Sequence, residues 1–369
     1  MSRATGIPSL RRALALGVLV LTARQSPDLA VDIRECVPVP HGSLYLEVRG
    51  RAAAGKPVLL WLHGGPGGAE RPMFELFNGG LERSFRVAYY DQRGAGRSFD
   101  PDAPAGMLTV AQHLADLDAI VEHLKAKQHV RRVILVGHSW GSLLAMLYAQ
   151  RHPGNVSAVI GVSQVVAPRA DQLEQYRFVS SAARRSRDDR TLDRLDGIGR
   201  PPLAGMRTLR LGRLVDRFGG TWHRRPGLIA MARAIVSGLV TPLEIPRFIR
   251  ANERSVGAMT PELLTIDLRD RDAALQVPVI MFLGRYDHQI STATASAYWR
   301  SLAAPAKSLR WFEGSAHNIP FEEPAAFDAC LASSLSKLPE FRGMPLRGVS
   351  CPYPELSVPN ASEVPAARR

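Results

Sequence analysis

The sequence predicts an α/β fold, with a mostly parallel central sheet flanked by helices and a helical cap inserted into it. Short apolar runs alternate with stretches that carry apolar residues at helical spacing, which is typical of a parallel sheet covered by helices. From about residue 167 to 270 the alternation stops, and helical stretches with Gly and Pro breaks but no clear strand follow. The alternation then resumes, so we interpret this segment as an insertion over the sheet.

The first half of the chain supplies most of the predicted sheet. Residues 31–48 predict two strands around a turn at 40–42. Apolar residues at helical spacing predict a helix over 109–125, with Thr109 as its N-cap, and another over 142–150. Continuous apolar runs, typical of strands buried on both faces, lie at 57–62, 85–90, 132–136 and 156–162.

The second half resumes the alternation and then changes character. Strands are expected at 277–283 and 308–312, and helices at 292–302 and 321–335. After about residue 337 the chain becomes rich in Pro, so we expect an extended or poorly ordered tail. The predicted organisation is an N-terminal segment (1–30), a core (31–166 and 271–337), a helical cap (167–270) and a Pro-rich tail (338–369).

The first chemical motif is Gly-His-Ser-Trp-Gly at 137–141. It follows a predicted strand and precedes a predicted helix, which is the context that a G-x-S-x-G turn requires. Such a sharp turn strains the serine backbone and crowds its neighbours, and Gly137 and Gly141 remove the side chains that would clash. We therefore predict that Ser139 is a nucleophile. The alternative is a serine that only caps the helix in a Gly-rich turn.

A serine hydroxyl is a weak nucleophile and needs a base. After a G-x-S-x-G turn, the expected chain order is serine, acid, histidine. Asp287 and His317 each follow the C-terminal end of a predicted strand, where open α/β sheets place their sites. We predict Asp287 as the acid and His317 as the base. His288 is interpreted as a solvent-facing loop residue, and His138 as a packing or supporting residue.

The oxyanion that forms in acyl transfer needs two backbone N–H donors. One is predicted at Trp140, the residue after the candidate nucleophile. The other is predicted at Gly65, in the loop His-Gly-Gly-Pro-Gly-Gly at 63–68. A phosphate-binding role for this loop is disfavoured, because it lacks the Lys and the spacing of a P-loop.

A third motif, Asp-Gln-Arg-Gly-Ala-Gly-Arg-Ser, occupies residues 91–98 after a predicted strand. We interpret it structurally, with Asp91 and Arg93 bracing the loops around the site. Together with His-Gly-Gly-Pro-Gly-Gly and Gly-His-Ser-Trp-Gly-Ser, it resembles the proline iminopeptidase family of α/β-hydrolases. The resemblance covers about residues 31–337.

The resemblance implies an α/β-hydrolase fold and the removal of an N-terminal proline or another residue from short peptides. It also implies a triad and oxyanion donors at Ser139, Asp287, His317, Gly65 and Trp140. In such families, acidic residues of the helical cap bind the free amine of the substrate. Glu253 is the best candidate here, followed by Glu174 and Glu244, although a surface residue that pairs with Arg explains each of them as well.

Three functional hypotheses follow. An aminopeptidase of the proline iminopeptidase type leads, acting on a short peptide or another small molecule. An esterase or amidase of small acyl substrates is the second, because the cap segment carries 19 Arg and no Lys against 12 acidic residues, and His138 stands where family peptidases commonly have Gly. A non-catalytic binding protein on a hydrolase scaffold is the third. No metal or organic cofactor is implied, since a triad and an oxyanion hole suffice for acyl transfer.

The overall charge does not change this interpretation. Arg supplies 42 of the 47 basic residues behind the formal charge of +13, and the Arg are scattered. Without a nucleic-acid-binding motif, we interpret them as a solvated basic surface and expect no nucleic-acid partner. The three cysteines form no metal motif, but an oxidising compartment would allow Cys330 to pair with Cys351.

The N-terminal segment has the layout of a signal peptide. Arg3, Arg11 and Arg12 precede an apolar run at 13–21, although an A-x-A cleavage pattern is absent. The run is too short for an ordinary membrane span. Export or membrane association through this segment and a cytoplasmic location are kept as equal alternatives.

Overall fold

The computed structural model describes residues 31–50, 56–224, 227–270, 274–344 and 350–357. The predictions for residues 1–30 lie outside these ranges. Among the helices that the structure describes, none has the length and apolar character needed to cross a membrane.

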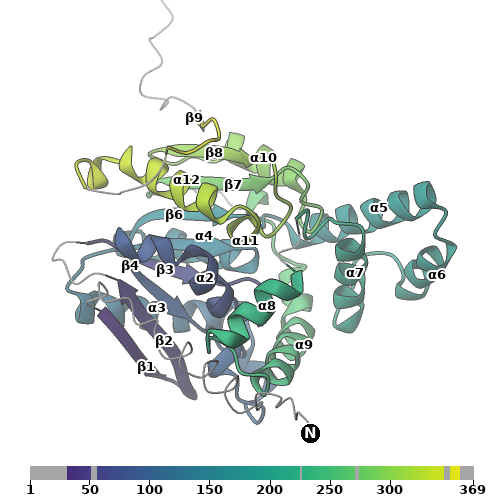
Figure 1. Ribbon diagram of the computed structural model, residues 1–369, viewed down its shortest axis with the longest axis horizontal. Coiled ribbons are helices and arrows are strands. Elements are labelled where there is room, and N and C mark those ends of the chain that lie inside the picture. Colours follow the sequence, from purple (N-terminus) through teal and green to yellow (C-terminus); the bar gives the residue numbers. More distant parts are fainter. Residues whose placement is uncertain (1–30, 51–55, 225–226, 271–273, 345–349, 358–369) are drawn as a thin grey trace, which may run out of the picture.

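A single nine-stranded sheet forms the centre of the molecule, in the order β1-β2-β4-β3-β5-β6-β7-β8-β9 (Figure 1). The six strands from β4 to β8 in this order run parallel, and β1, β2 and β9 are antiparallel additions at the edges. The predicted fold class is therefore confirmed. The strands are β1 Val31–Val39, β2 Gly42–Gly50, β3 Val58–Leu62, β4 Arg86–Tyr90, β5 Val133–His138, β6 Val156–Val162, β7 Val279–Gly284, β8 Lys307–Phe312 and β9 Leu356–Ser357.

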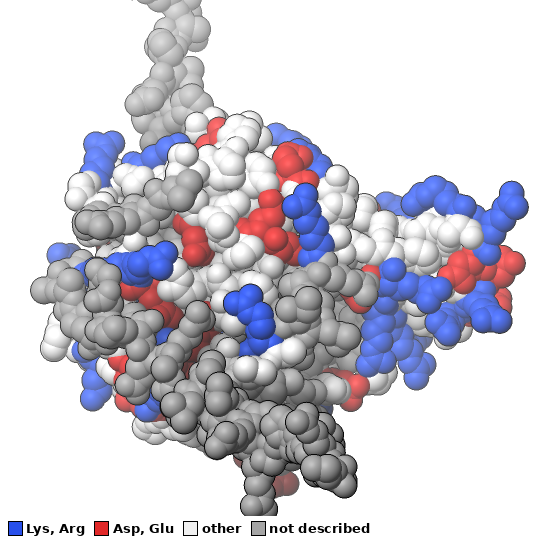
Figure 2. Space-filling view, in the orientation of Figure 1, with Lys and Arg blue, Asp and Glu red and all other residues white. Residues whose placement is uncertain are grey.

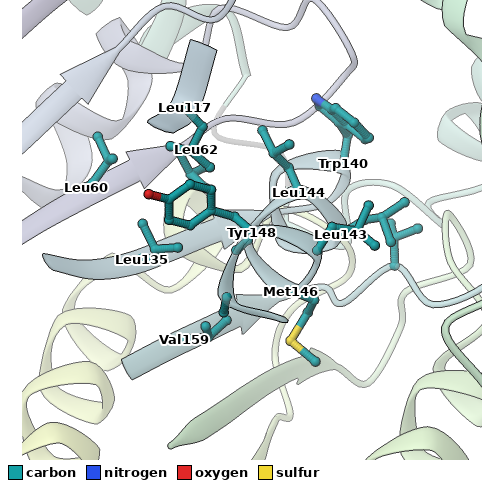
Figure 3. Packing of buried hydrophobic residues seen from close by; sticks show 14 of the residues in the cluster. Leu60, Leu62, Leu117, Leu135, Trp140, Leu143, Leu144, Met146, Tyr148 and Val159 are labelled. Carbon is teal, nitrogen blue, oxygen red and sulfur yellow. The ribbon is translucent and has the colours of Figure 1, made fainter. Parts of the chain in front are cut away.

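The central strands are apolar on both faces because helices cover both faces. Every residue of β3, β5, β6 and β7 is buried. Side chains alternate between two clusters, so that Leu60 and Leu62 enter one and Leu59 and Trp61 enter the other. Figure 3 shows the first cluster around the helix that follows β5. Full burial of each such Leu contributes about 1.5–3 kcal/mol.

The helices of the core agree with the predicted pattern, with one difference. Thr109 caps its helix as expected and accepts a hydrogen bond from Gln112 N. The single helix expected over 321–335 is two helices, because the chain leaves helical geometry at Glu323 and Pro324 starts the second one. The core helices are α2 Arg71–Asn78, α3 Val110–Gln128, α4 Trp140–Arg151, α10 Thr292–Ser301, α11 Ile319–Glu322 and α12 Pro324–Ser336. Short 3-10 turns lie at Gly79–Arg83, Gly96–Ser98, Ala105–Met107, Pro153–Asn155, Leu268–Asp270 and Pro339–Phe341.

The inserted cap is helical and lies between β6 and β7 in the chain. Its helices are α5 Pro168–Ser186, α6 Asp189–Ile198, α7 Met206–Arg217, α8 Gly227–Val236 and α9 Glu244–Leu263. Helices α5, α6 and α7 share a small apolar cluster of their own and project from the core (Figure 1). Arginines gather on this projecting arm (Figure 2). Helix α9 instead lies on the core, where Asn252 donates to Pro66 O and Ser255 donates to Gly94 O.

The start of the Pro-rich tail is more ordered than the sequence predicts. Residues 350–357 pack against the core, and β9 pairs with β8. Cys351 forms a disulfide with Cys330 of α12, and Glu355 forms an ion pair with the buried Arg310. Of the two alternatives expected for the tail, the extended one describes this stretch and the poorly ordered one does not, because a covalent bond and a buried charge both need the segment in place.

Candidate active site

Strand β5 ends in a strained turn that carries Ser139. This residue has a φ of 53° and a ψ of −122°, a conformation that side chains other than Gly rarely adopt. A Cβ on Gly137 would lie 2.5 Å from the carbonyl carbon of Gly141, and a Cβ on Gly141 would lie 2.6 Å from that of Leu62. Both glycines are therefore required by contacts with neighbouring backbone, as the motif predicts.

The candidate acid and base come together from the ends of β7 and β8. His317 Nδ1 lies 2.9 Å from Asp287 Oδ2, and both residues are buried. The other carboxylate oxygen of Asp287 accepts hydrogen bonds from the backbone N–H groups of Gln289 and Ile290. Because the carboxylate accepts, Nδ1 of His317 carries the proton, and Nε2 is left to accept one.

Ser139 and His317 line one cavity of about 710 Å³ between the sheet and the cap. Gly65 and Trp140, the predicted oxyanion donors, line it too. This volume suits a small molecule or a short peptide. In the described part of the chain, no group of three or more His, Cys, Asp or Glu residues is placed to hold a metal ion.

Backbone geometry and one glutamine hold the loop at 63–68, which carries Gly65, and the turn that carries Ser139. Gly65 has a φ of 122°, and a Cβ there would lie 2.5 Å from Gly68 N. Gln92 accepts a hydrogen bond of 2.8 Å from the indole of Trp140 and donates two to His63, one to the ring Nε2 and one to the carbonyl oxygen. Gln92 thus joins all three sequence motifs. Sequence reasoning missed it, although it stands inside the third motif.

The rest of the third motif braces loops, as its structural interpretation expects. Arg93 donates to both carboxylate oxygens of Asp116, at 2.7 and 2.8 Å, and to the carbonyl oxygens of Pro40 and His41. Asp91 accepts a hydrogen bond of 2.8 Å from the backbone N–H of Arg97. Neither Asp91 nor Arg93 lines the cavity of Ser139.

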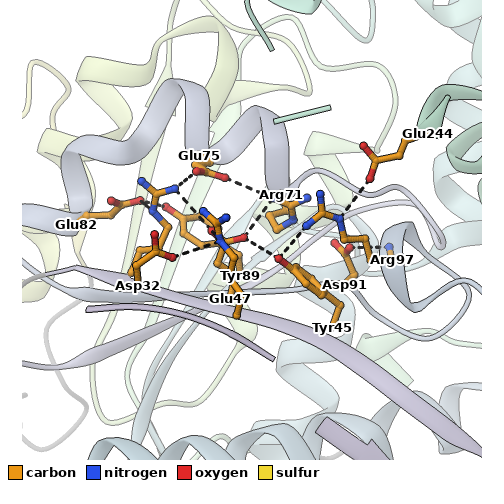
Figure 4. Close-up of polar contacts among 12 residues, drawn as sticks. Asp32, Tyr45, Glu47, Arg71, Glu75, Glu82, Tyr89, Asp91, Arg97 and Glu244 are labelled. Atoms are coloured by element: carbon orange, nitrogen blue, oxygen red, sulfur yellow. Dashed lines mark hydrogen bonds and ion pairs between the residues drawn. The ribbon is translucent and has the colours of Figure 1, made fainter. Parts of the chain in front are cut away.

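An ion network, buried at α2 and partly exposed at the cap, connects this motif to both (Figure 4). Glu47 on β2 pairs with Arg71 at the start of α2 and accepts a hydrogen bond from the Tyr45 hydroxyl. Arg97 donates to that hydroxyl and pairs with Glu244 of α9. Glu244 is therefore engaged outside the cavity by an Arg, as the alternative interpretation of this residue expects, and its prediction as a reserve amine binder is wrong.

The other two predicted cap carboxylates differ in their placement. Glu174 bonds to His288 at 3.0 Å and does not line the cavity, so its expected role in amine binding is also wrong. His288, expected to be a solvent-facing loop residue, lies in the loop after β7, is partly exposed and bonds to Glu174. Glu253 does line the cavity, but it pairs with Arg213 at 3.5 Å, and both side chains are exposed.

Three further carboxylates, which the sequence did not single out, line the cavity: Glu70, Asp171 and Asp216. Asp171 lies in the first turn of α5 and is buried. Its Oδ1 accepts a hydrogen bond of 2.8 Å from Ser291 N, just after the loop that holds the candidate acid. Burial raises the pKa of Asp171 to about 8.

Glu70 pairs with His138, the residue before the candidate nucleophile. His138 Nδ1 lies 2.8 Å from Glu70 Oε1, and His138 Nε2 lies 3.0 Å from the carbonyl oxygen of His317. Burial opposes both charges, yet mutual attraction and the shared hydrogen bond raise the pKa of His138 and lower that of Glu70. The supporting role expected for His138 thus has a partner, two residues after the His-Gly-Gly-Pro-Gly-Gly loop, that the sequence did not indicate.

Comparison with known proteins gives a consistent picture. The family profile described as alpha/beta hydrolase fold matches residues 57–324. The chain is 28% identical to the "Probable aminopeptidase YbaC" of Bacillus subtilis, covering 76% of this chain and 88% of the relative. It is 29% identical to a proline iminopeptidase of Xylella fastidiosa, covering 81% and 97%. The crystal structure of a proline iminopeptidase from Mycobacterium smegmatis superposes with a TM-score of 0.62 at 19% identity, covering 83% of this chain and 98% of that one.

Proposed function

Because this chain belongs to the α/β-hydrolase family, and within it is similar to proline iminopeptidases, we propose that it is a serine hydrolase acting through an acyl-enzyme. We further propose that it releases the N-terminal residue of short peptides. The observation that carries this proposal is that Ser139 and His317 line one cavity, with Asp287 bonded to Nδ1 of His317.

In the proposed reaction, Ser139 Oγ attacks the carbonyl carbon of the N-terminal residue, and His317 Nε2 takes the hydroxyl proton. Negative charge develops on the carbonyl oxygen, where the N–H groups of Gly65 and Trp140 stabilise it. His317 then gives its proton to the leaving amine as the peptide bond breaks. Water, activated by His317, attacks the ester and regenerates Ser139. Asp287 holds the imidazole in the required tautomer throughout.

A free substrate amine needs acceptors on the cavity wall, and Asp171 is our candidate. Its Oδ1 is used by Ser291 N, which leaves Oδ2 without a hydrogen bond to any described residue. An ammonium group placed against it would favour the ionised carboxylate, since opposite charges at contact distance stabilise each other in a buried site. Glu253 is a weaker candidate, because Arg213 already neutralises it.

The direct test is the release of arylamine from prolyl-β-naphthylamide and from other aminoacyl arylamides. Ser139→Ala should abolish it and should also abolish labelling by a fluorophosphonate probe. Labelling of the wild type without activity on any aminoacyl arylamide would reject the peptidase assignment and keep the serine hydrolase.

A second candidate function is an esterase or amidase for small acyl substrates. It is favoured by the paired state of Glu253 and by the many apolar residues around the cavity, Leu143, Val165, Leu209, Phe248, Ile249, Val256, Leu263 and Leu264. Asp171→Asn separates the two functions, because it keeps the acceptor for Ser291 N and removes the charge. For an aminopeptidase, KM for an aminoacyl arylamide should rise about 10- to 100-fold, the value of one charge-assisted hydrogen bond, while cleavage of an acetyl ester should not change. Equal effects on both substrates would favour the esterase.

A further inference from the structure

His138 is held between two hydrogen-bond acceptors. One is the Glu70 carboxylate at 2.8 Å from Nδ1, and the other is the carbonyl oxygen of His317 at 3.0 Å from Nε2. Although burial opposes its charge, attraction to His138 lowers the pKa of Glu70 and keeps its carboxylate ionised. Neither this carboxylate nor a carbonyl can donate a hydrogen bond, so the two contacts are both satisfied when both ring nitrogens carry protons. The ring is buried and packs near the rings of Trp61 and Phe321, which fix its plane. The contacts therefore describe a buried imidazolium beside the candidate nucleophile.

This pair connects three segments that meet at the site. Glu70 comes two residues after the loop that carries Gly65, and His138 directly precedes Ser139 in the turn. The carbonyl oxygen that His138 contacts belongs to His317 itself. The same oxygen accepts a second hydrogen bond, of 2.7 Å, from Ser163 Oγ. The backbone of the candidate base is thus held by side chains from two other segments, His138 in the turn and Ser163 after β6, as well as by its own loop.

We propose that Glu70 and His138 act as positioning residues, a charged clamp that holds the His317 backbone and the Gly65 loop against Ser139, and that opens when His138 loses a proton. The proposal rests on the proposed serine hydrolase, since the clamp acts through Ser139 and His317. Neither clamp residue needs to exchange protons with a substrate.

The chemistry of the imidazole explains why a lost proton opens the clamp. A neutral ring has one N–H, so one of the two contacts would set a lone pair against a lone pair, at either Glu70 or the His317 carbonyl. The other titratable groups near His138 are the His317 ring, whose centroid lies 5.0 Å away, and the more distant Asp287, while His63 lies near Glu70. Attraction to Glu70 raises the pKa of His138 despite its burial, so the clamp is expected to persist at neutral pH.

Two substitutions separate geometry from charge. Glu70→Ala removes the partner of Nδ1 and should loosen the clamp at every pH. Glu70→Gln can donate its amide to an unprotonated Nδ1, while Nε2–H still donates to the His317 carbonyl, so a neutral ring satisfies both contacts. Glu75→Gln is a matched control, because Glu75 lies on α2, pairs with Arg49 and Arg71, and does not line the cavity.

The measured quantity is the rate at which a fluorophosphonate acylates Ser139, followed from about pH 6 to about pH 10. Small displacements of catalytic groups cost up to about 100-fold in rate, so Glu70→Ala should be acylated about 10- to 100-fold more slowly. Glu70→Gln should recover most of this loss. The wild type and Glu75→Gln should lose rate on the alkaline side, and Glu70→Gln should lack that limb. A purely structural role for Glu70 would leave the shape of the pH profile unchanged.

The outcomes distinguish the clamp from the function it rests on. If the wild type is not acylated at Ser139, the serine hydrolase proposal fails and the clamp's positioning role falls with it. If the wild type is acylated but Glu70→Ala reacts at the same rate, or Glu70→Gln keeps the alkaline limb, only the clamp is rejected. Nitrogen-15 spectra of the ring test the charge independently: His138 should carry two N–H groups at neutral pH in the wild type and one in Glu70→Gln. A neutral wild-type ring overturns the proposal.

Discussion

Replacement of Gly137 by Ala tests whether the backbone around Ser139 tolerates any side chain at this position. The added Cβ would lie 2.5 Å from the carbonyl carbon of Gly141 and 2.6 Å from Ser142 N. Ordinary contact begins at 3.4 Å, so the added Cβ would overlap the carbonyl carbon by 0.9 Å and the nearer carbonyl oxygen of Gly141 by more. The atoms in the way belong to the backbone at the start of α4, which is buried along almost its whole length.

Because no flexible side chain can move aside, the cost should reach the upper end of the range for overpacking, about 3 kcal/mol. Gly137→Ala should lower the free energy of unfolding by that amount, measured by urea denaturation with tryptophan fluorescence. Any displacement of the turn should also slow fluorophosphonate labelling of Ser139 by about 100-fold.

Gly257→Ala is the matched control for this substitution. Gly257 lies inside α9, is exposed, and a Cβ there would meet nothing within 4 Å. The same chemical change should therefore raise the free energy of unfolding by up to about 1 kcal/mol, the difference in helix propensity. If the free energy of unfolding of Gly137→Ala lies within about 1 kcal/mol of the wild-type value and Ser139 is labelled at the same rate, the steric account of the turn is wrong.

Three other predictions use the same structure. Asp287→Asn should reduce kcat by about 10⁴-fold with little change in KM, because His317 loses the partner that sets its tautomer. Steady-state kinetics measure both constants, and a loss of kcat below tenfold would contradict the assigned role of Asp287. Cys351→Ser should lower the free energy of unfolding by about 3 kcal/mol, given the sequence separation of 21 between the cysteines; an unchanged urea midpoint would refute it. The pKa of Asp171, about 8 when folded, lies above its unfolded value, so this group destabilises the fold increasingly as pH rises from about 4 to about 8. Asp171→Asn should therefore gain stability relative to the wild type above pH 8 and match it near pH 4, which thermal melts across that range can check.

The parallel core could be predicted because each of its strands carries its own signal. A strand buried on both faces must be apolar throughout, as β3, β5, β6 and β7 are. Ser139 follows β5 and Asp287 follows β7, while His317 follows β8, which is buried over most of its length. The parallel sheet then brings their strand ends to one edge, although 178 residues separate Ser139 from His317. The local sequence pattern and the topology of a parallel sheet were together sufficient to predict that these residues lie near one another.

Cap residues were harder to place, because an acidic residue on a helix has no local sign of what it faces. Glu253, Glu174 and Glu244 look alike in the sequence, yet only Glu253 lines the cavity. The other two bond to His288 and Arg97, which lie far from them in the chain. Which face of a helix meets the core depends on tertiary packing. The many Arg in the cap sequence therefore gave no indication that one acidic residue among them, Asp171, is buried at the cavity.

Contacts between distant segments also escaped prediction at the site and at the tail. Glu70 and His138 are 68 residues apart, and only the folded loop brings the carboxylate to the ring. In the tail, the sequence allowed the Cys330–Cys351 bond that the structure shows, but composition carries no record of the Arg310 charge that needs Glu355.

The short strand β9 has a consequence for solubility. It occupies the outer edge of the sheet beside β8, pairing with Ser308 and Leu309, and the disulfide holds it there. An uncovered edge strand offers unpaired N–H and C=O groups to other chains and is a template for aggregation. Reducing conditions should thus expose part of β8 and make the protein associate edge to edge, so its colloidal behaviour should depend on the redox state of its surroundings.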